Sequence, residues 1–142
     1  MIFVVDSNVL FTFFWKDSAF EGIVSKEIKL FSPEFALKEI NKHSSEIMKK
    51  SGLTETEFKK KKEELPKRVK FISLEEYSDF LKQAELLAKN LSETEKSELL
   101  KDIDFLALAL KLCCSIWTND NLFKKQSEIS IFTTKEMIEL LS

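Results

Sequence analysis

Glycine, proline, cysteine and histidine are scarce in this sequence of 142 residues, which has two glycines, two prolines, two cysteines and one histidine. Gly22 and Gly52 stand far apart, so no glycine-rich loop can bring backbone N–H groups against a phosphate. This excludes P-loop NTPases and dinucleotide-binding oxidoreductases. The single histidine, His43, argues against serine–histidine or paired-histidine catalysis, and we interpret it as a surface or packing residue.

The cysteines and the opening segment indicate the compartment. Cys113 and Cys114 are adjacent and close to apolar residues, so we expect reduced thiols packed at the end of a helix rather than a disulfide or a zinc site. The opening residues MIFVVDSNVL have no basic leader and reach Asp6 after a short apolar run. We therefore expect neither a signal peptide nor a membrane span, and we expect a cytoplasmic protein.

Apolar and charged side chains are both plentiful, at 44% and 32% of the sequence, which is typical of one folded domain. Thirteen phenylalanines supply large side chains for a core. At this length about two-thirds of the unfolded surface can be buried. The fold therefore needs neither a metal nor a disulfide for stability, and any bound metal would be functional.

Charge is segregated along the chain, although the net charge is only −2. Residues 49–70 carry nine basic and four acidic side chains, a local charge of +5 that leaves −7 for the remainder. This segment is either a nucleic-acid-binding flank or a solvated helix face, because four consecutive lysines on a helix point in several directions. The chain lacks the strong overall positive charge of proteins that coat duplex DNA.

Short apolar runs alternate with segments long enough for helices. Ile2–Val5 is a continuous run that stops at Asp6, which indicates a strand buried on both faces. Similar runs are Lys29–Phe31, Val69–Ile72, Ser115–Trp117 and Ile129–Phe132. Val69–Ile72 is the least secure of these strands, because it could instead lead into a helix that starts near Ser73.

Capping signals mark the helices between these runs. Capping-box pairs occur at Thr54 and Glu57, Ser73 and Glu76, Ser92 and Glu95, and Thr133 and Glu136. Pro33 is expected at the first position of a helix that follows Ser32, and residues 53–65 are expected to form an extra helix that ends at Pro66. The alternation predicts an α/β protein with an open, mainly parallel sheet and helices on both faces, a three-layer α/β/α sandwich.

Two aspartates follow predicted strands, at the edge of a parallel sheet where ligands bind. Asp6 lies in Asp6-Ser7-Asn8 after the first strand, and Asp120 lies just beyond the strand that ends near Trp117. Taken singly, each could be a helix cap or a turn residue.

Three further acids lie on or next to predicted helices. Asp102 and Asp104 introduce an apolar, alanine-rich helix, where Asp102 could be the N-cap and where the helix dipole also favours an ionised carboxylate. Glu39 lies on an apolar stretch about two turns into the helix expected from Pro33, and could be a half-exposed boundary residue.

If these acids converge, their repulsion raises some pKa values unless a cation offsets it. Oxygen ligands favour Mg²⁺ or Mn²⁺, and this predicts metal-assisted hydrolysis of a phosphate ester.

Four segments, in order, resemble the motifs of the PIN-domain nucleases over essentially the whole chain. Val4–Leu10 resembles the opening strand and acidic turn of that family. The second motif is matched by Ser32-Pro33-Glu34 leading to Glu39-Ile40, and the third by Asp102 with the helix after it. Trp117-Thr118-Asn119-Asp120, with Phe123, resembles the fourth.

The resemblance implies a PIN-like fold and an acidic catalytic pocket. It implies a single PIN-like domain over residues 1–142, with a basic helical insert at about 49–70. The implied catalytic acids and metal ligands are Asp6, Glu39, Asp102 and Asp120, with Asn8 and Thr118 as supporting groups. Asp102 is preferred to Asp104 because it lies 18 residues before Asp120, as is usual in the family. Asp104 remains a second candidate ligand that either contacts a second ion or caps the helix.

The function implied is a Mg²⁺- or Mn²⁺-dependent endoribonuclease. From the basic segment of this chain we expect residues such as Lys60 and Arg68 to guide the RNA backbone. Many small prokaryotic members are VapC-type toxins that form homodimers and bind an antitoxin, but the longer basic insert departs from the most compact toxins. One alternative is a weak or inactive PIN-like module that binds RNA or docks a partner. Another is a receiver-like phosphoacceptor domain, which would need an acidic pair after the first strand, where Asp6 stands alone.

Overall fold

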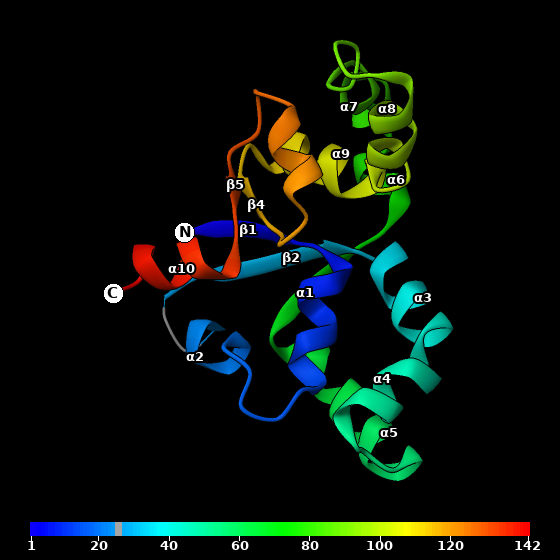
Figure 1. Cartoon of the computed structure of the whole chain (residues 1–142), viewed down its shortest axis with the longest axis vertical. Coiled ribbons are helices and arrows are strands. Elements are labelled where there is room, and N and C mark those ends of the chain that lie inside the picture. Colours follow the sequence, from blue (N-terminus) through cyan, green and yellow to red (C-terminus); the bar gives the residue numbers. More distant parts are fainter. Residues whose placement is uncertain (25–26) are drawn as a thin grey trace.

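A parallel β-sheet runs through the middle of the protein, and helices cover both of its faces, as seen in the computed structural model in Figure 1. The structure describes residues 1–24 and 27–142. In these residues the sheet has five strands in the order β3-β2-β1-β4-β5, and every neighbouring pair is parallel. The strands are β1 (Ile2–Val5), β2 (Lys29–Pro33), β3 (Val69–Ile72), β4 (Ser115–Trp117) and β5 (Ile131–Phe132).

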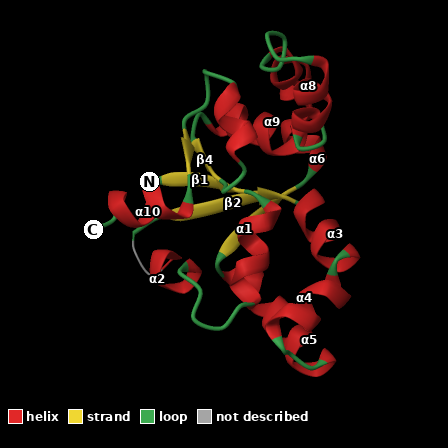
Figure 2. Ribbon diagram, in the orientation of Figure 1, coloured by secondary structure: helices red, strands yellow, loops and turns green. Residues whose placement is uncertain are grey.

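The helices form the two outer layers (Figure 2). One face carries α1 (Ser7–Phe11), α2 (Phe20–Val24), α3 (Phe35–Lys42), α4 (Ser44–Ser51) and α5 (Glu55–Glu64). The other carries α6 (Leu74–Tyr77), α7 (Leu81–Leu86), α8 (Glu93–Leu100) and α9 (Ile103–Leu112), and α10 (Thr134–Leu140) follows β5. Four 3₁₀ turns complete the described elements: η1 (Thr12–Phe14), η2 (Leu65–Lys67), η3 (Ser78–Phe80) and η4 (Asn121–Lys125). This is the predicted three-layer α/β/α sandwich.

The predicted strands are all present, with two differences at their ends. Pro33 belongs to β2, opposite Ile72, and α3 begins only at Phe35, so the prediction that Pro33 opens the helix was wrong. The ladder continues past Pro33 because the backbone N–H of Glu34 donates to the carbonyl of Ile72 at 2.9 Å. At β5, Ile129 lies outside the strand because the side chain of Gln126 binds both its N–H and its carbonyl.

Three of the four predicted capping boxes form, at Thr54, Ser92 and Thr133. Ser73 occupies the N-cap position of the short helix α6, but its side chain makes no capping bond.

The expectation of two packed thiols was wrong for Cys113, which ends α9 in a left-handed conformation and is exposed. Only Cys114 packs against the core, and both thiols are free.

The core on the α9 face is built from the apolar run that the sequence indicated. Residues Phe105–Ala109 of α9 are all buried, and this helix packs on β1, β2 and β4. On the other face, η1 and α5 are joined by Phe14 and Phe58, whose ring centroids lie 5.0 Å apart. No helix in the described residues is long and apolar enough to span a membrane.

Candidate active site

Asp6 lies at the carboxyl end of the central strand, where the polar ends of β1 and β4 meet. Its backbone N–H donates to the carbonyl of Trp117, and its side chain is only 3% exposed. Thr118 Oγ1 donates to Asp6 Oδ2 at 2.6 Å and itself accepts from the backbone N–H of Asp120 at 3.0 Å. One buried hydroxyl therefore links two of the acids that the sequence singled out.

Glu39 enters the site from α3, and Ser7 holds it there. Ser7 Oγ donates to Glu39 Oε1 at 2.7 Å, and Ser7, the first residue of α1, is buried. The sequence interpretation missed Ser7, since a serine after a strand is a common cap. The only signal that could have found it is its position next to Asp6.

Asp102 occupies the N-cap position of α9, but its side chain does not cap the helix. The predicted N-cap position is confirmed, and the carbonyl of Asp102 accepts from the N–H of Phe105 at 3.1 Å. Its backbone, with φ −109° and ψ 23°, lacks the extended conformation of most N-cap residues, which leaves the carboxylate without a capping bond. Burial, and after it the charges of Asp6, Glu39 and Asp120, together raise its pKa from an ordinary value of 3.8 to about 7. The Asp102 carboxylate therefore lies close enough to the three other acids for their negative charges to act on it.

The electrostatics of Asp6 show the same convergence. Burial, together with the charges of Glu39 and Asp120, brings its pKa from 3.8 to about 6. The hydrogen bonds from Thr118 and from the backbone of Asn8 oppose this rise. The four acids on separate elements therefore form one electronegative region at the carboxyl edge of the sheet.

The other predicted site residues lie in different surroundings. Asp104 Oδ2 accepts a hydrogen bond from the hydroxyl of buried Tyr77, whose pKa is raised chiefly by burial and then by Asp104. The side chain of Asn8 is exposed, and its backbone is what acts on Asp6. Asp104 thus has a structural partner on α6, which the sequence did not indicate.

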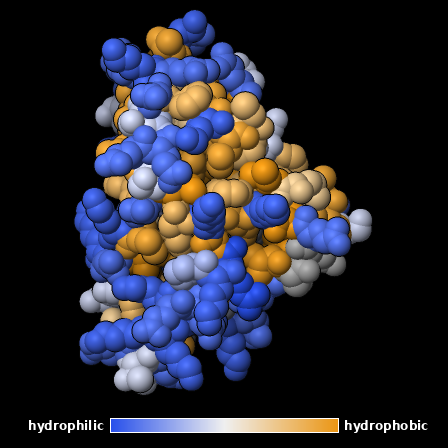
Figure 3. Space-filling model, turned by 180° about the vertical axis from the view of Figure 1, so that it is seen from behind, coloured by the Kyte–Doolittle hydropathy of each residue, from blue (hydrophilic) through white to orange (hydrophobic). Residues whose placement is uncertain are grey.

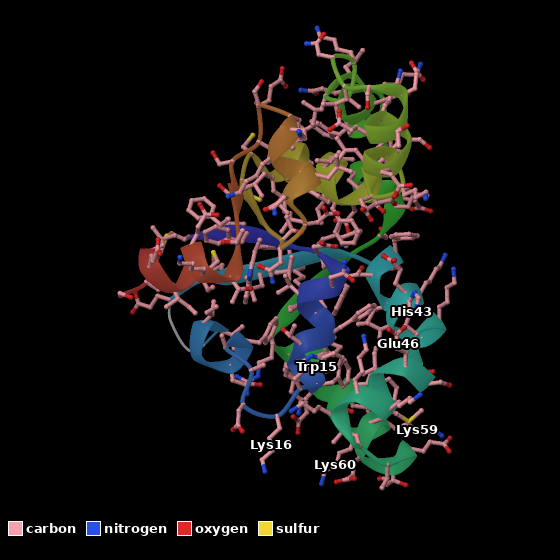
Figure 4. The ribbon with its side chains drawn as sticks, in the orientation of Figure 1. Trp15, Lys16, His43, Glu46, Lys59 and Lys60 are labelled. Atoms are coloured by element: carbon pink, nitrogen blue, oxygen red, sulfur yellow. The ribbon has the colours of Figure 1, made fainter. Side chains whose placement is uncertain are left out.

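The two predicted RNA contacts lie apart from the acids. Arg68 Nη2 is 3.4 Å from Glu21 Oε2, and each of these side chains is less than half exposed. Lys60 lies at the end of the molecule that carries α5, away from the point where β1 meets α1 (Figure 4). The structure therefore brings neither Lys60 nor Arg68 to the acidic region.

A hard divalent cation fits the donor chemistry of this region. The side chains offered are carboxylates, which such ions prefer, and their mutual repulsion is the feature that a cation would relieve. Yet no three acidic, histidine or cysteine side chains of the described ranges 1–24 and 27–142 form a group arranged to hold an ion. The carboxylates influence one another electrostatically, but they are not arranged as a complete set of ligands around one ion. Asp6, Glu39, Asp102 and Asp120 are therefore candidate ligands.

Fold and site together define an α/β/α protein with an acidic site at the carboxyl edge of a parallel sheet. A sequence comparison with protein families gives a more specific assignment. The family model of the PIN domain matches residues 4–141, and the chain belongs to the PIN domain family.

Structural comparison agrees with this fold. The chain is similar to a chain in the crystal structure of VapBC2 from Rickettsia felis bound to a DNA fragment from their promoter, with a TM-score of 0.66 and 12% identity. The similarity covers 94% of this chain and 98% of that chain. A comparison with curated protein sequences gave no significant match.

Proposed function

We propose that this PIN-domain protein is a Mg²⁺- or Mn²⁺-dependent endoribonuclease that hydrolyses phosphodiester bonds in RNA. The observation that carries the proposal is the shared electrostatic field of the four acids, which raises the pKa values of Asp6 and Asp102. Burying carboxylates together costs folding free energy, and binding a divalent cation would recover it.

Each group in the site has a proposed part. Asp6, Glu39, Asp102 and Asp120 would hold the metal, which when bound activates a water molecule and neutralises charge on the phosphoryl group. Thr118 orients Asp6 and the backbone of Asp120, and Ser7 orients Glu39. Asp104 stabilises the start of α9 through Tyr77 rather than contacting the ion.

The test is incubation of the purified protein with a pool of cellular RNAs with and without Mn²⁺, followed by mapping of the product ends. Defined ends that require Mn²⁺ and are lost in Asp6→Asn support the proposal. Identical products from the parent and a folded Asp6→Asn variant would remove Asp6 from the site and overturn it.

A second candidate function is an inactive module that binds RNA or docks a partner. The observation that favours it is the lack of a preformed three-ligand group among the residues the structure describes. In the same experiment this module would retain RNA in a filter-binding measurement but would give no Mn²⁺-dependent product ends.

The partners are also a proposal. Similarity to a chain of a VapBC2 complex supports an antitoxin-type protein partner for this chain, and family membership supports a homodimer. Co-purification with the product of a neighbouring gene and light scattering of the isolated protein test these two proposals separately.

A further inference from the structure

The two ends of the molecule carry opposite charge. Residues 35–70, which include α3, α4 and α5, have eleven basic and six acidic side chains. Residues 73–142, which include α6 to α9, have eight basic and thirteen acidic side chains. Figure 1 shows α5 and α8 at opposite ends of the longest axis. Figure 3 shows hydrophilic side chains at both ends, so the two ends differ in the sign of their charge rather than in polarity. A polyanion is therefore attracted to one end of the protein.

The basic end has a defined structure. Lys61 Nζ lies 4.9 Å from the centroid of the Phe13 ring, and the ring of Phe14 packs on Phe58, so η1 is fixed against α5. Trp15 and Lys16 directly follow η1, and Figure 4 shows Lys16 and Lys60 at the same end of the molecule. We call Trp15, Lys16 and Lys60 the α5 surface.

The groups of this surface are available to a ligand. Lys16 and Lys60 are exposed, and none of the ion pairs found within residues 1–24 and 27–142 involves either of them. By contrast, Lys59 is paired with Glu55 at 3.1 Å. Trp15 is partly exposed, whereas the other tryptophan, Trp117, is buried at 1% exposure. Ammonium groups without an ion-pair partner and an accessible indole, on elements that pack together, are the features that bind phosphates and an unstacked base.

We propose that the α5 surface binds single-stranded RNA as a second contact, distant from the acidic site, and so rests on and extends the proposed ribonuclease function. Lys16 and Lys60 contact backbone phosphates, and Trp15 contacts a base. A base can reach an indole only if it is not paired and stacked in a duplex, which selects single-stranded RNA. Arg68 has no part in this surface, because it is paired with Glu21.

The test measures the affinity of a fluorescently labelled, unstructured RNA of about 30 nucleotides in EDTA, where metal-dependent cleavage is blocked. We expect Lys16→Glu/Lys60→Glu to weaken binding at least about tenfold and to reduce the slope of log affinity against log salt by about 1.4, for two phosphate contacts. The matched control is Lys82→Glu/Lys89→Glu, which makes the same change of charge at two exposed lysines near α7. It should change the affinity by less than about twofold.

Tryptophan fluorescence gives an independent readout. Since Trp117 is buried, RNA-dependent quenching should come from Trp15 and should be absent in Trp15→Phe. Equal losses in the two double variants, unchanged affinity of Lys16→Glu/Lys60→Glu, or no RNA binding by the parent would each overturn the proposal. Unchanged RNA affinity with loss of a protein partner would assign the surface to that partner instead.

Cleavage with Mn²⁺ separates this proposal from the proposed function. If Lys16→Glu/Lys60→Glu cleaves RNA with the parental KM, the α5 surface is overturned and the nuclease stands. If binding depends on this surface but neither the parent nor any variant yields Mn²⁺-dependent products, the nuclease function fails and the α5 surface stands.

Discussion

The hydroxyl of Thr118 donates a 2.6 Å hydrogen bond to Asp6, although 112 residues separate the two in sequence. Both side chains are buried, and the same hydroxyl accepts from the N–H of Asp120. We predict that Thr118→Val, which keeps the shape but removes the hydroxyl, lowers the free energy of unfolding by about 1–3 kcal/mol. Mn²⁺-dependent cleavage should also fall, because Asp6 and Asp120 lose their common partner.

Urea denaturation and cleavage assays of this variant check the prediction, with Thr118→Ser as the control that keeps the hydroxyl. Full stability and parental activity in Thr118→Val would show that the hydrogen bond contributes nothing to the site.

Ser7→Ala removes the donor that holds Glu39. Groups that orient metal ligands typically affect affinity by about 10–100-fold, so we expect Mn²⁺ binding measured by calorimetry to weaken by at least about tenfold. Ser32→Ala is a matched control, because Ser32 is equally buried but donates to the carbonyl of Val5, a contact within the sheet. Equal effects of the two variants on Mn²⁺ affinity would contradict a positioning role for Ser7.

The raised pKa of Asp6 makes the stability of the metal-free protein depend on pH. Because the folded-state pKa of about 6 lies above the ordinary 3.8, protonation favours the folded state. This stabilisation is complete below about pH 4 and is lost as the pH rises through about 6, a change of about 3 kcal/mol.

Replacing Asp6 by asparagine removes this dependence. In EDTA, the stability of Asp6→Asn relative to the parent should therefore increase by up to about 3 kcal/mol between about pH 4 and pH 8. Urea denaturation at several pH values measures this difference, and a constant difference would mean that Asp6 titrates normally.

Mn²⁺ should raise the melting temperature of the parent, and more at about pH 8 than at about pH 5.5, where protons compete for Asp6 and Asp102. Binding to the folded state adds about 2.7 kcal/mol when the free ion is roughly 100-fold above Kd. Asp102→Asn should abolish the shift, whereas Asp104→Asn should retain it because Asp104 is engaged by Tyr77. Retention in Asp102→Asn and loss in Asp104→Asn would reverse the assignment of these two residues.

The places of Asp6 and Asp120 at the edge of the sheet could be predicted, because each depends on the strand that immediately precedes it. Asp6 and Asp120 follow buried strands, and parallel strands bring their carboxyl ends to one edge. Ser7 and the Tyr77–Asp104 contact were not predictable, because each depends on how a helix lies across the sheet. The pairing of Arg68 with Glu21 likewise joins segments whose proximity no local pattern encodes.

The prediction that a helix starts at Pro33 was wrong for a different reason. A proline after serine is a common first residue of a helix, but here pairing with β3 extends β2 by one position. Cross-strand pairing therefore overrode a local signal, as the side chain of Gln126 did at Ile129.

Sheet order also fixes when the site can assemble during synthesis. β1 precedes the other four described strands in sequence, yet it lies between β2 and β4, and β4 follows β1 by more than a hundred residues. A nascent polypeptide that still lacks residues 115–120 leaves one flank of β1 open and Asp6 without its threonine. The acids can therefore meet only after residues 115–120 have been synthesised and have left the ribosome, so a growing chain that is shorter than this has no complete acidic site.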